Sequence, residues 1–168
     1  FSVLNQLHVV KSMDVSGESL AALRYAQGAS SVTCMVTLLS QGISMKSDDQ
    51  SFLNRMFEQQ FTTSHKNFFL NIFSDYRQIW SLCESKKFDL IHLHGMWSPL
   101  LVIAALIAKR KGINLIISPH GGLEPWALRN KYYKKLIAMK IYQSAILRSA
   151  SLLVATADQE LRSLRKFG

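Results

Sequence analysis

The sequence predicts an α/β protein built on a Rossmann-like, doubly wound and mostly parallel sheet. Two observations predict this fold class. Short runs rich in Val, Ile and Leu recur along the 168 residues, and segments with apolar residues at helical spacing separate them. The runs are apolar throughout, as in strands that helices cover on both faces. The sequence shows no linker or internal repeat, so we expect a single domain over residues 1–168.

The first half of the chain predicts three strands and two helices. Ser16 has the position of an N-cap, because an acidic first turn and apolar residues at helical spacing follow it. The expected elements are strands at Leu4–Val10, Ser31–Leu39 and Gln59–Ser64, a polar loop at Ser40–Gln50, and helices after Ser16 and over Lys66–Cys83. The second helix carries an apolar stripe that we expect in the core, formed by Phe69, Ile72, Phe73, Tyr76, Ile79, Trp80 and Cys83.

The second half of the chain continues the alternation of strands and helices. The expected strands are Asp89–Leu93, Ile113–Ser118 and Ser151–Ala155, and the expected helices are Pro99–Lys111, Lys131–Arg148 and Asp158–Phe167. We expect the helix at 131–148 to bury Leu136, Ile137, Met139, Ile141 and Ile146. The uncharged stretch Leu90–Ala108 is long enough to cross a bilayer, but turn residues in its middle would leave backbone groups unpaired in lipid. We therefore interpret it as a strand, a loop and a helix.

The composition excludes several classes of protein. Hydrophobic residues make up 48% of the chain, too many for a disordered polyelectrolyte, and 8 Gly and 3 Pro are too few for a fibrous protein. The two cysteines, Cys34 and Cys83, are too few for a disulfide scaffold and lie in apolar segments. We expect both to be reduced core residues of a cytoplasmic protein.

The positive charge is concentrated in one part of the chain. Residues 109–168 hold 12 basic and 3 acidic residues, and these account for the whole net charge of +9. Such a field indicates an anionic partner, either a phosphate-bearing ligand, a nucleic acid or acidic lipid headgroups. A solubilising surface also explains the charge, and the charge alone favours that interpretation.

Ligands of doubly wound sheets bind at the carboxyl ends of the strands, so the candidate segments are 14–18, 94–98, 119–126 and 156–158. Ser16 and Gly17 open the first helix there, where free N–H groups and the helix dipole can hold a phosphate. The chain lacks the GxGxxG fingerprint and the P-loop lysine, which argues against a nicotinamide or P-loop site. Helix capping alone also explains Ser16.

Three histidines lie near the predicted strand ends. His92 and His94 are two residues apart and therefore share a face of one strand, and His120 follows the next strand. A histidine pair with a distant third histidine resembles a zinc pattern, but no acidic residue or cysteine stands at ligand spacing, so we expect no metal. A neutral imidazole can instead exchange hydrogen bonds with a sugar hydroxyl.

Three segments of the chain resemble a known family. They are DLIHLHGMWSP at 89–99, SPHGGLEPWALRNKYYKK at 118–135 and ATADQELRSLRKFG at 155–168. In combination they are similar to the N-terminal half of the group 1, or family 4, retaining glycosyltransferases, which have the GT-B architecture. The similarity is strong from residue 89 onward and weak between residues 40 and 64.

The resemblance implies roles for individual residues. His120 is expected as the catalytic residue, near the transferred sugar and the acceptor hydroxyl, with Gly121 and Gly122 opening the pocket beside it. Ser16 and Gly17 are expected to contact the donor diphosphate, although family members more often have two or three glycines there. The remaining substrate-binding residues implied are His94 and Trp97 on the acceptor side and Glu124, Trp126 and Arg129 at its rim.

The resemblance also implies the substrates and partners. The donor is a nucleoside-diphosphate sugar, the acceptor is a saccharide or a lipid-linked molecule, and neither a metal nor another cofactor is expected. The family's C-terminal donor domain has no counterpart in this sequence, so we expect the chain to be inactive alone. The basic and apolar residues at 129–140 suit peripheral contact with an anionic membrane at its cytoplasmic face.

Two other classes of function stay open at the level of sequence. A nucleic-acid-binding module would use the charge of +9, although the chain has no signature of such a module and we expect no nucleic acid as partner. A histidine-metal hydrolase would use His92, His94 and His120. The sequence sets no oligomeric state.

Overall fold

The computed structural model describes residues 4–14, 16–30, 34–41, 58–61 and 67–166. These residues form a parallel sheet whose six strands lie in the order β3-β2-β1-β4-β5-β6. This is the strand order of a doubly wound Rossmann fold, so the predicted fold class is confirmed. The strands are β1 (Leu4–Val10), β2 (Cys34–Ser40), β3 (Glu58–Phe61), β4 (Leu90–His94), β5 (Asn114–Ser118) and β6 (Leu152–Leu153).

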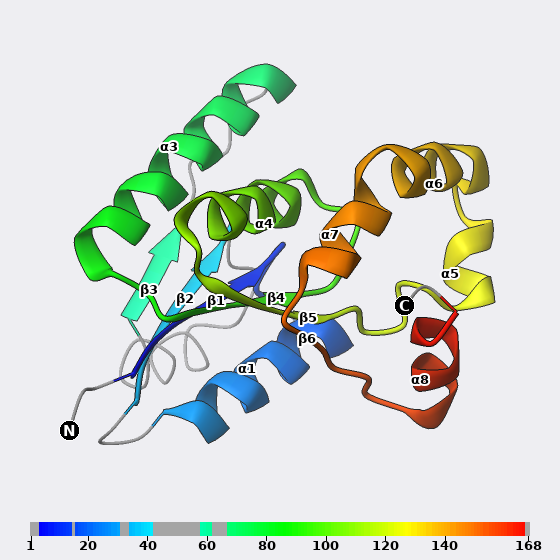
Figure 1. Ribbon diagram of the computed structural model, residues 1–168, viewed down its shortest axis with the longest axis horizontal. Coiled ribbons are helices and arrows are strands. Elements are labelled where there is room, and N and C mark those ends of the chain that lie inside the picture. The colour runs from blue at the N-terminus through cyan, green and yellow to red at the C-terminus, as the bar shows by residue number, and fades with distance from the viewer. Residues whose placement is uncertain (1–3, 15, 31–33, 42–57, 62–66, 167–168) are drawn as a thin grey trace.

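Helices cover both faces of the sheet (Figure 1). One face lies under α3 (Phe68–Lys86), α4 (Pro99–Lys111) and α7 (Ser144–Ser149), and the other lies over α1 (Gly17–Ala29). Beyond one end of the sheet, the chain forms α5 (Pro125–Arg129), α6 (Tyr132–Ala138), the π-helical turn η1 (Met139–Gln143) and α8 (Asp158–Leu164).

Strand alternation divides the interior into two parts. Leu7 and Val9 of β1 belong to the large apolar cluster under α3, α4 and α7, as do Ile91 and Leu93 of β4. The residues between them point to the opposite face, because successive side chains of a strand alternate. On that face the apolar cluster against α1 has seven buried members among the described residues, and buried histidines of β1 and β4 lie beside it.

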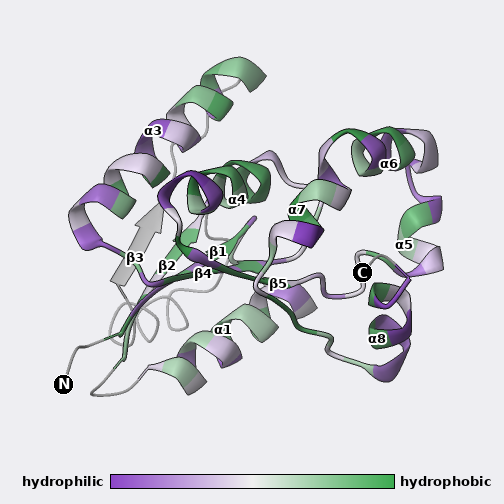
Figure 2. Ribbon diagram, viewed as in Figure 1, coloured by the Kyte–Doolittle hydropathy of each residue, from purple (hydrophilic) through white to green (hydrophobic). Residues whose placement is uncertain are grey.

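Local sequence signals explain how the helices begin and end. The Ser16 side chain accepts a hydrogen bond from the Ser19 N–H and so caps α1, as predicted. Pro99 stands in the first turn of α4, and Gly112 ends this helix with a φ of +66°. Figure 2 shows α4 as largely hydrophobic, which fits a helix packed between the sheet and α3. The uncharged stretch at 90–108 is thus a strand, a turn and a buried helix, as predicted.

The predicted helix at 131–148 is one helical path in three parts, and its expected burial is partly wrong. Ile146 is buried and Met139 is half-buried, but Leu136, Ile137 and Ile141 are 42%, 58% and 72% exposed. The reason is that α6 packs mainly against α5 and η1 rather than over the sheet (Figure 1). Only α7 returns to the sheet.

Further expectations need smaller corrections. In the α3 stripe, Ile79 and Cys83 are buried as predicted, but Phe69 and Phe73 are 78% and 60% exposed, because the first turns of α3 extend beyond the sheet (Figure 1). The helix α5 was not predicted. Residues 31–33, 42–57, 62–66 and 167–168, which include parts of two predicted strands, the polar loop and the end of the last helix, lie outside the described residues.

The structure bears on the expected state of the cysteines and on membrane-spanning segments. Cys34 and Cys83 are free and buried, as predicted. Among the described residues, no helix combines the length and the apolar character that crossing a bilayer requires.

The turn after β4 should be sensitive to any side chain at Gly95. Its φ is +89°, and a Cβ built there would lie 2.3 Å from an oxygen of Glu18. We expect Gly95→Ala to lower the free energy of unfolding by about 1–2 kcal/mol, because both the backbone and the Glu18 side chain must shift. Gly28→Ala is the control, since a Cβ on this α1 residue meets nothing within 4 Å and should stabilise by roughly 0.5–1 kcal/mol. Urea denaturation checks both variants, and equal stability of Gly95→Ala and wild type would contradict the prediction.

Candidate functional site

The candidate site lies at the carboxyl edge of the sheet. The strand order reverses direction between β1 and β4, and the loops after these strands diverge there to opposite faces. The loop after β1 leads into α1, and the turns after β4 and β5 carry Trp97 and His120. Both residues have a positive φ, of 66° and 50° respectively. A left-handed backbone is costly for non-glycine residues, above all for a bulky one, and such strain is found mostly at functional sites.

Three histidines form a hydrogen-bonded row, which we call the histidine row, consisting of His8, His94 and His120. The Nδ1 atom of His8 lies 3.0 Å from Nε2 of His94, and Nδ1 of His94 lies 3.2 Å from Nε2 of His120. His8 and His94 are buried, and His120 is half-buried. The rings of His94 and His120 stack at 5.4 Å. The predicted proximity of His94 and His120 is therefore observed, with His94 beneath His120.

Two further aromatic side chains border the histidine row. His92 lies directly opposite His8 in the sheet, and its Nε2 atom makes a 2.8 Å hydrogen bond with Oγ of Ser118. Tyr25 of α1 lies across the rings from the other side, 5.4–6.5 Å from those of His92, His94 and His120. The sequence analysis did not identify His8 or Tyr25. His8 could have been identified from its position, because a histidine in an otherwise apolar strand is a polar residue that must find a partner in the interior.

The buried histidines are neutral near pH 7. Burial lowers the pKa of His8 to about 4 and that of His92 to about 3, and it lowers the pKa of His94 well below its ordinary value. Burial also lowers the pKa of His120, against an opposing effect of the Glu160 carboxylate. Each imidazole of the row therefore has one N–H donor and one lone-pair acceptor.

Glu18 is a second titratable group at this edge, and it lies in the first turn of α1 at the end of the predicted candidate segment 14–18. Its carboxylate covers Gly95, as the space around that glycine shows. Burial raises the pKa of Glu18 to about 7, while Lys11 opposes this shift and Asp14 adds to it. Glu18 therefore changes its charge in the neutral range.

The turn around Ser16 and Gly17, where the sequence predicts a donor-phosphate site, is occupied by an acidic side chain. The carboxylate of Asp14 accepts hydrogen bonds from Ser16 N–H at 2.9 Å and from the hydroxyls of Ser12 and Ser19 at 3.0 and 2.9 Å. These bonds lower the pKa of Asp14 to about 2. A phosphate at Ser16 and Gly17 would have to approach this negative charge, and its binding there stays a prediction.

A larger pocket lies beside the turn after β4, and we call it the basic pocket. Its volume is about 410 Å³. It is lined by four lysines, from the β1–α1 loop, the α5–α6 loop and α6, and by the half-buried indole of Trp97. Its lining residues are Lys11, Met96, Trp97, Ser98, Pro99, Asn130, Lys131, Lys134, Lys135, Ala138 and Tyr142.

Trp97 and Lys135 form the wall of the basic pocket. The indole N–H of Trp97 donates to the carbonyl of Gly122 at 3.1 Å, and the ammonium of Lys135 lies 5.3 Å from the indole centre. Lys135 also donates to the carbonyl of Ala127 at 2.6 Å. Burial and the nearby Lys131 lower the pKa of Lys135. The strained Trp97 is thus held in place from both sides.

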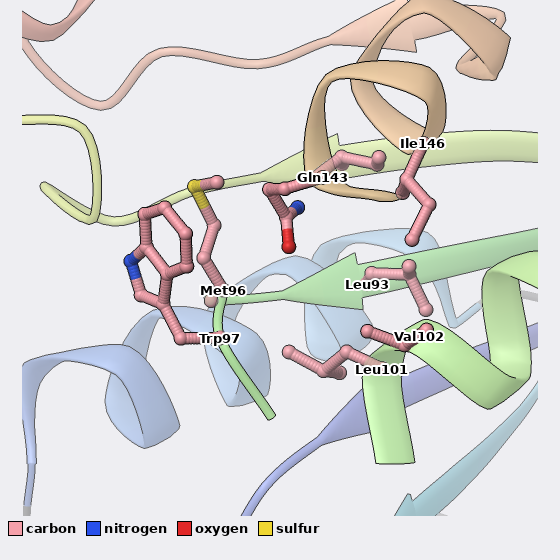
Figure 3. Close-up of a pocket in the computed structure, with 9 residues that line it drawn as sticks. Leu93, Met96, Trp97, Leu101, Val102, Gln143 and Ile146 are labelled. Atoms are coloured by element: carbon pink, nitrogen blue, oxygen red, sulfur yellow. The ribbon is translucent and has the colours of Figure 1, made fainter. Parts of the chain in front are cut away.

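A much smaller cavity adjoins the basic pocket behind Trp97 (Figure 3). Gln143, from the π-helical turn η1, points its amide into this cavity toward Met96. The amide oxygen of Gln143 is buried without a hydrogen-bond partner among the described residues. The cavity measures about 10 Å³, near the lower limit for one water molecule.

The other predicted site residues lie in the loop after β5 and in α5. Glu124 is buried, and its carboxylate accepts hydrogen bonds from Gln159 at 2.6 Å and Ser163 at 3.2 Å, so it faces α8. Gly121 has a φ of +78°, and its N–H donates to Glu160 of α8 at 2.6 Å. Trp126 is 69% exposed and Arg129 is exposed. A Cβ on Gly122 would lie 3.0 Å from the carbonyl oxygen of Pro119, so this turn is tight.

The described residues include one trio whose spacing would suit a metal ion. The ring nitrogens of His8, His92 and His94 lie within 4.8 Å of one another, and all three residues are buried. Two of these nitrogens, on His8 and His94, are already within hydrogen-bond distance. This trio differs from the pattern that the sequence offered, in which His120 was the third member.

The family of the chain follows from a comparison with family models. Residues 22–168 match the model of Glycosyltransferase Family 4. The chain belongs to this family. The predicted resemblance is confirmed, and it extends over most of the described site. A comparison with curated proteins gives no significant match.

Solved structures of the family's architecture resemble the chain in fold. They include a glycosyltransferase from Rickettsia africae (TM-score 0.64, 14% identity), MurG from Acinetobacter baumannii (0.61, 11%) and a UDP-GlcNAc 2-epimerase from Neisseria meningitidis bound to UDP-GlcNAc (0.66, 14%). The match covers 98%, 93% and 97% of this chain and 39%, 42% and 43% of theirs. The chain thus spans about two fifths of these proteins.

The stability of the protein should depend on pH through Glu18. A carboxyl whose pKa is raised by folding stabilises the folded state below its unfolded value of 4.5, and this contribution is lost as the pH rises through about 7. Glu18→Gln should therefore have the same stability as wild type at pH 4.5 and exceed it by about 2–3 kcal/mol at pH 8. Urea denaturation at both pH values measures the difference. Asp158→Asn, which changes an exposed carboxylate in the first turn of α8, is the control, and a constant difference between Glu18→Gln and wild type would contradict the assignment.

Proposed function

We propose that the chain is the acceptor-binding domain of a retaining glycosyltransferase that moves a sugar from a nucleoside-diphosphate sugar to a saccharide or lipid-linked acceptor. Membership of glycosyltransferase family 4 supports the reaction class. Two of the proteins with a similar fold were solved with UDP-GlcNAc or UDP, which supports a nucleotide-sugar donor. The transfer itself needs no metal in this proposal.

The observation that carries the proposal is the basic pocket at the carboxyl edge. Lysine ammonium groups pair with phosphate oxygens, and an indole face packs against a sugar ring. Lys11, Lys131, Lys134 and Lys135 supply the charge, and Trp97 supplies the ring. An acceptor that combines phosphate with a sugar fits this lining, and His120 would orient the acceptor hydroxyl that takes the new sugar.

An apolar pocket next to the basic pocket favours the lipid-linked form of such an acceptor. Its volume is about 120 Å³, and most of its lining residues are apolar. Lys135 borders both pockets, so a phosphate held by lysine would stand beside an apolar surface suited to a hydrocarbon chain. The apolar pocket is lined by Leu128, Tyr132, Lys135, Leu136 and Met139.

The proposed donor-binding contacts extend beyond this chain. By the family resemblance, the groups that hold the donor belong mainly to a second Rossmann-like domain, and Ser16 and Gly17 would add contacts to the diphosphate. We therefore propose that these 168 residues bind the acceptor but do not transfer sugar alone. His94 would support His120, while Glu124, Trp126 and Arg129 would define the end of the site nearest α8 and α5.

We further propose that α5, α6 and η1 contact an anionic membrane at its cytoplasmic face. Tyr133, Ile137 and Ile141 are 78%, 58% and 72% exposed, a degree of apolar exposure that is unusual on one helical segment. Exposed basic side chains lie among them, namely Arg129, Lys131, Lys134 and Lys140. Hydrophobic insertion and attraction to acidic headgroups then act on the same surface.

Binding of a short polyprenyl phosphate tests the acceptor proposal. We expect Lys131→Ala combined with Lys134→Ala to weaken binding of farnesyl phosphate at least about tenfold, because each charged hydrogen bond contributes on the order of 1.5–3 kcal/mol. Titration followed by NMR measures the dissociation constants. Lys109→Ala, at the far end of α4, is the control and should leave them unchanged. Equal affinity for farnesol and farnesyl phosphate would contradict a phosphate site, and displacement by random oligonucleotides would favour a nucleic-acid module.

Sedimentation with liposomes tests the membrane contact. We expect the chain to bind vesicles that contain phosphatidylserine and not vesicles of phosphatidylcholine alone. Lys140→Glu and Ile141→Asn should each reduce bound protein several-fold, since a basic residue near such a surface contributes about 1 kcal/mol. The control is Lys109→Glu, the same charge change outside this surface. Sedimentation that is independent of lipid charge would contradict the proposal.

A further inference from the structure

We propose that the histidine row fixes the tautomer of His120, so that Nε2 of His120 carries the proton and Nδ1 keeps its lone pair for a substrate hydroxyl. His8 and His94 are then positioning residues that act through His120. The inference rests on the proposed function, because the proposed substrate contact of His120 gives the free lone pair its use.

Gln6 lies next to His8 at the inner end of the histidine row, and the orientation of its amide determines which nitrogen of His8 carries the proton. The side chain of Gln6 hydrogen-bonds the thiol of Cys34, and this bond opposes the rise of the thiol pKa that burial causes. The amide is placed with its oxygen toward the row, which leaves its N–H₂ group for the sulfur. Its Oε1 atom is left for His8, whose Nε2 lies 3.3 Å away. An amide oxygen can only accept, and His8 must therefore carry its proton on Nε2.

The tautomer of each ring then determines the tautomer of the next ring in the row. A neutral His8 with a proton on Nε2 has a lone pair on Nδ1, so His94 must donate its Nε2–H across the 3.0 Å contact. The Nδ1 atom of His94 then holds a lone pair, and His120 must donate its Nε2–H across the 3.2 Å contact. Each ring uses one donor and one acceptor, and the last free lone pair lies on Nδ1 of His120.

This order requires that His8 and His94 are neutral, because an imidazolium at either place would set two N–H groups against each other. It also requires a neutral His120, because protonation would replace the lone pair on its Nδ1 atom with an N–H group. Burial lowers the pKa of all three rings, as described above. The groups that face the row are Tyr25 from α1, His92 from β4 and Glu160 from α8. Glu160 acts on His120 alone and has its own partners, Gly121 and Thr156.

The end of the row is accessible and constrained. His120 is half-buried, and within the described part of the chain no hydrogen bond is found at its Nδ1 atom. Its left-handed φ of 50° and the bond from the next residue, Gly121, to Glu160 hold the ring over His94. A hydroxyl group of a substrate can therefore donate to Nδ1 without disturbing the row.

A metal ion would exclude this arrangement. A metal shared by His8 and His94 would occupy the lone pairs that the row uses, and His94 could then no longer donate to His8. The short contact between His8 and His94 is a hydrogen bond in the row, so we expect purified protein to contain less than a tenth of an equivalent of zinc, nickel, cobalt or iron. A stoichiometric metal in elemental analysis would overturn the proposal.

NMR spectroscopy of the ¹⁵N-labelled chain tests the tautomers directly. Long-range ¹H–¹⁵N correlation spectra distinguish a protonated ring nitrogen from one with a lone pair. At pH 7 we expect His8, His94 and His120 to be neutral with the proton on Nε2. A proton on Nδ1 of His120, or a cationic His120 at this pH, would overturn the proposal without any variant.

A matched pair of variants tests whether His8 directs the row. His8→Asn keeps an oxygen acceptor near the place of Nδ1, whereas His8→Phe keeps a ring of similar size without an acceptor. We expect the Nε2–H tautomer of His120 to persist in His8→Asn and to be replaced by a mixture of tautomers in His8→Phe. If His8→Phe does not fold, Gln6→Leu is the alternative variant. It removes the amide oxygen that accepts from Nε2 of His8, at a half-buried position, and should produce the same mixture of tautomers. If His120 kept the Nε2–H tautomer in His8→Phe or Gln6→Leu, the proposal that His8 fixes this tautomer would be overturned.

These measurements separate the inference from the proposed function. The tautomers are read in the absence of donor and acceptor, so the spectra can support the row even if farnesyl phosphate does not bind. Addition of glucose 1-phosphate, which carries the sugar hydroxyls that farnesyl phosphate lacks, should shift the Nδ1 resonance of His120 more than that of His92, which faces Ser118. The reverse order would overturn the assigned use of the lone pair while leaving phosphate binding by the lysines intact.

Discussion

The parallel pairing of β1 with β4 is the constraint on which the site depends. The register places His8 opposite His92 and Val10 opposite His94, and alternation turns the three imidazoles to the face over α1. Burial on that face removes their charge, and only neutral rings can exchange hydrogen bonds in series. A slip of β4 by one residue in this register would turn His92 and His94 into the apolar core under α4 and away from His8.

The two faces of the sheet hold different kinds of interaction. The face under α3, α4 and α7 holds the large apolar cluster and supplies most of the hydrophobic stabilisation. The face over α1 has a smaller apolar cluster and accommodates polar groups that are hydrogen-bonded to one another. The lysines and exposed apolar residues beyond the edge belong to α6 and its neighbours, which pack little on the sheet. The apolar core, the hydrogen-bonded histidines and the proposed ligand-binding surface thus lie in three different parts of the domain.

Much of the fold could be predicted from the sequence because its strands are short, apolar and separated by clear helical patterns. The cap at Ser16, the proline of α4 and the glycine after it all act through neighbouring residues, so their effects are visible in the sequence. The burial of Ile137 and Ile141 could not be predicted in the same way. Periodicity shows that a helix has an apolar face, but it does not show whether that face meets a sheet or solvent.

The candidate site was predictable in part for a similar reason. His94 and His120 follow neighbouring strands, and that position alone brought them together. The contribution of His8 depends on strand order, since a residue far away in sequence lies beside His94 only when β1 is inserted between β2 and β4. The burial of Glu124 against α8 and the raised pKa of Glu18 depend on packing between loops and helices, for which the sequence has no periodic signal.

The bonds between α8 and the loop after β5 have a mechanical consequence. Glu160 holds Gly121 and Thr156, and Glu124 holds Gln159 and Ser163, so the loop and the helix are joined at both ends of their contact. A displacement of α8 would therefore carry the loop after β5 with it, and the imidazole of His120 would move with that loop relative to His94.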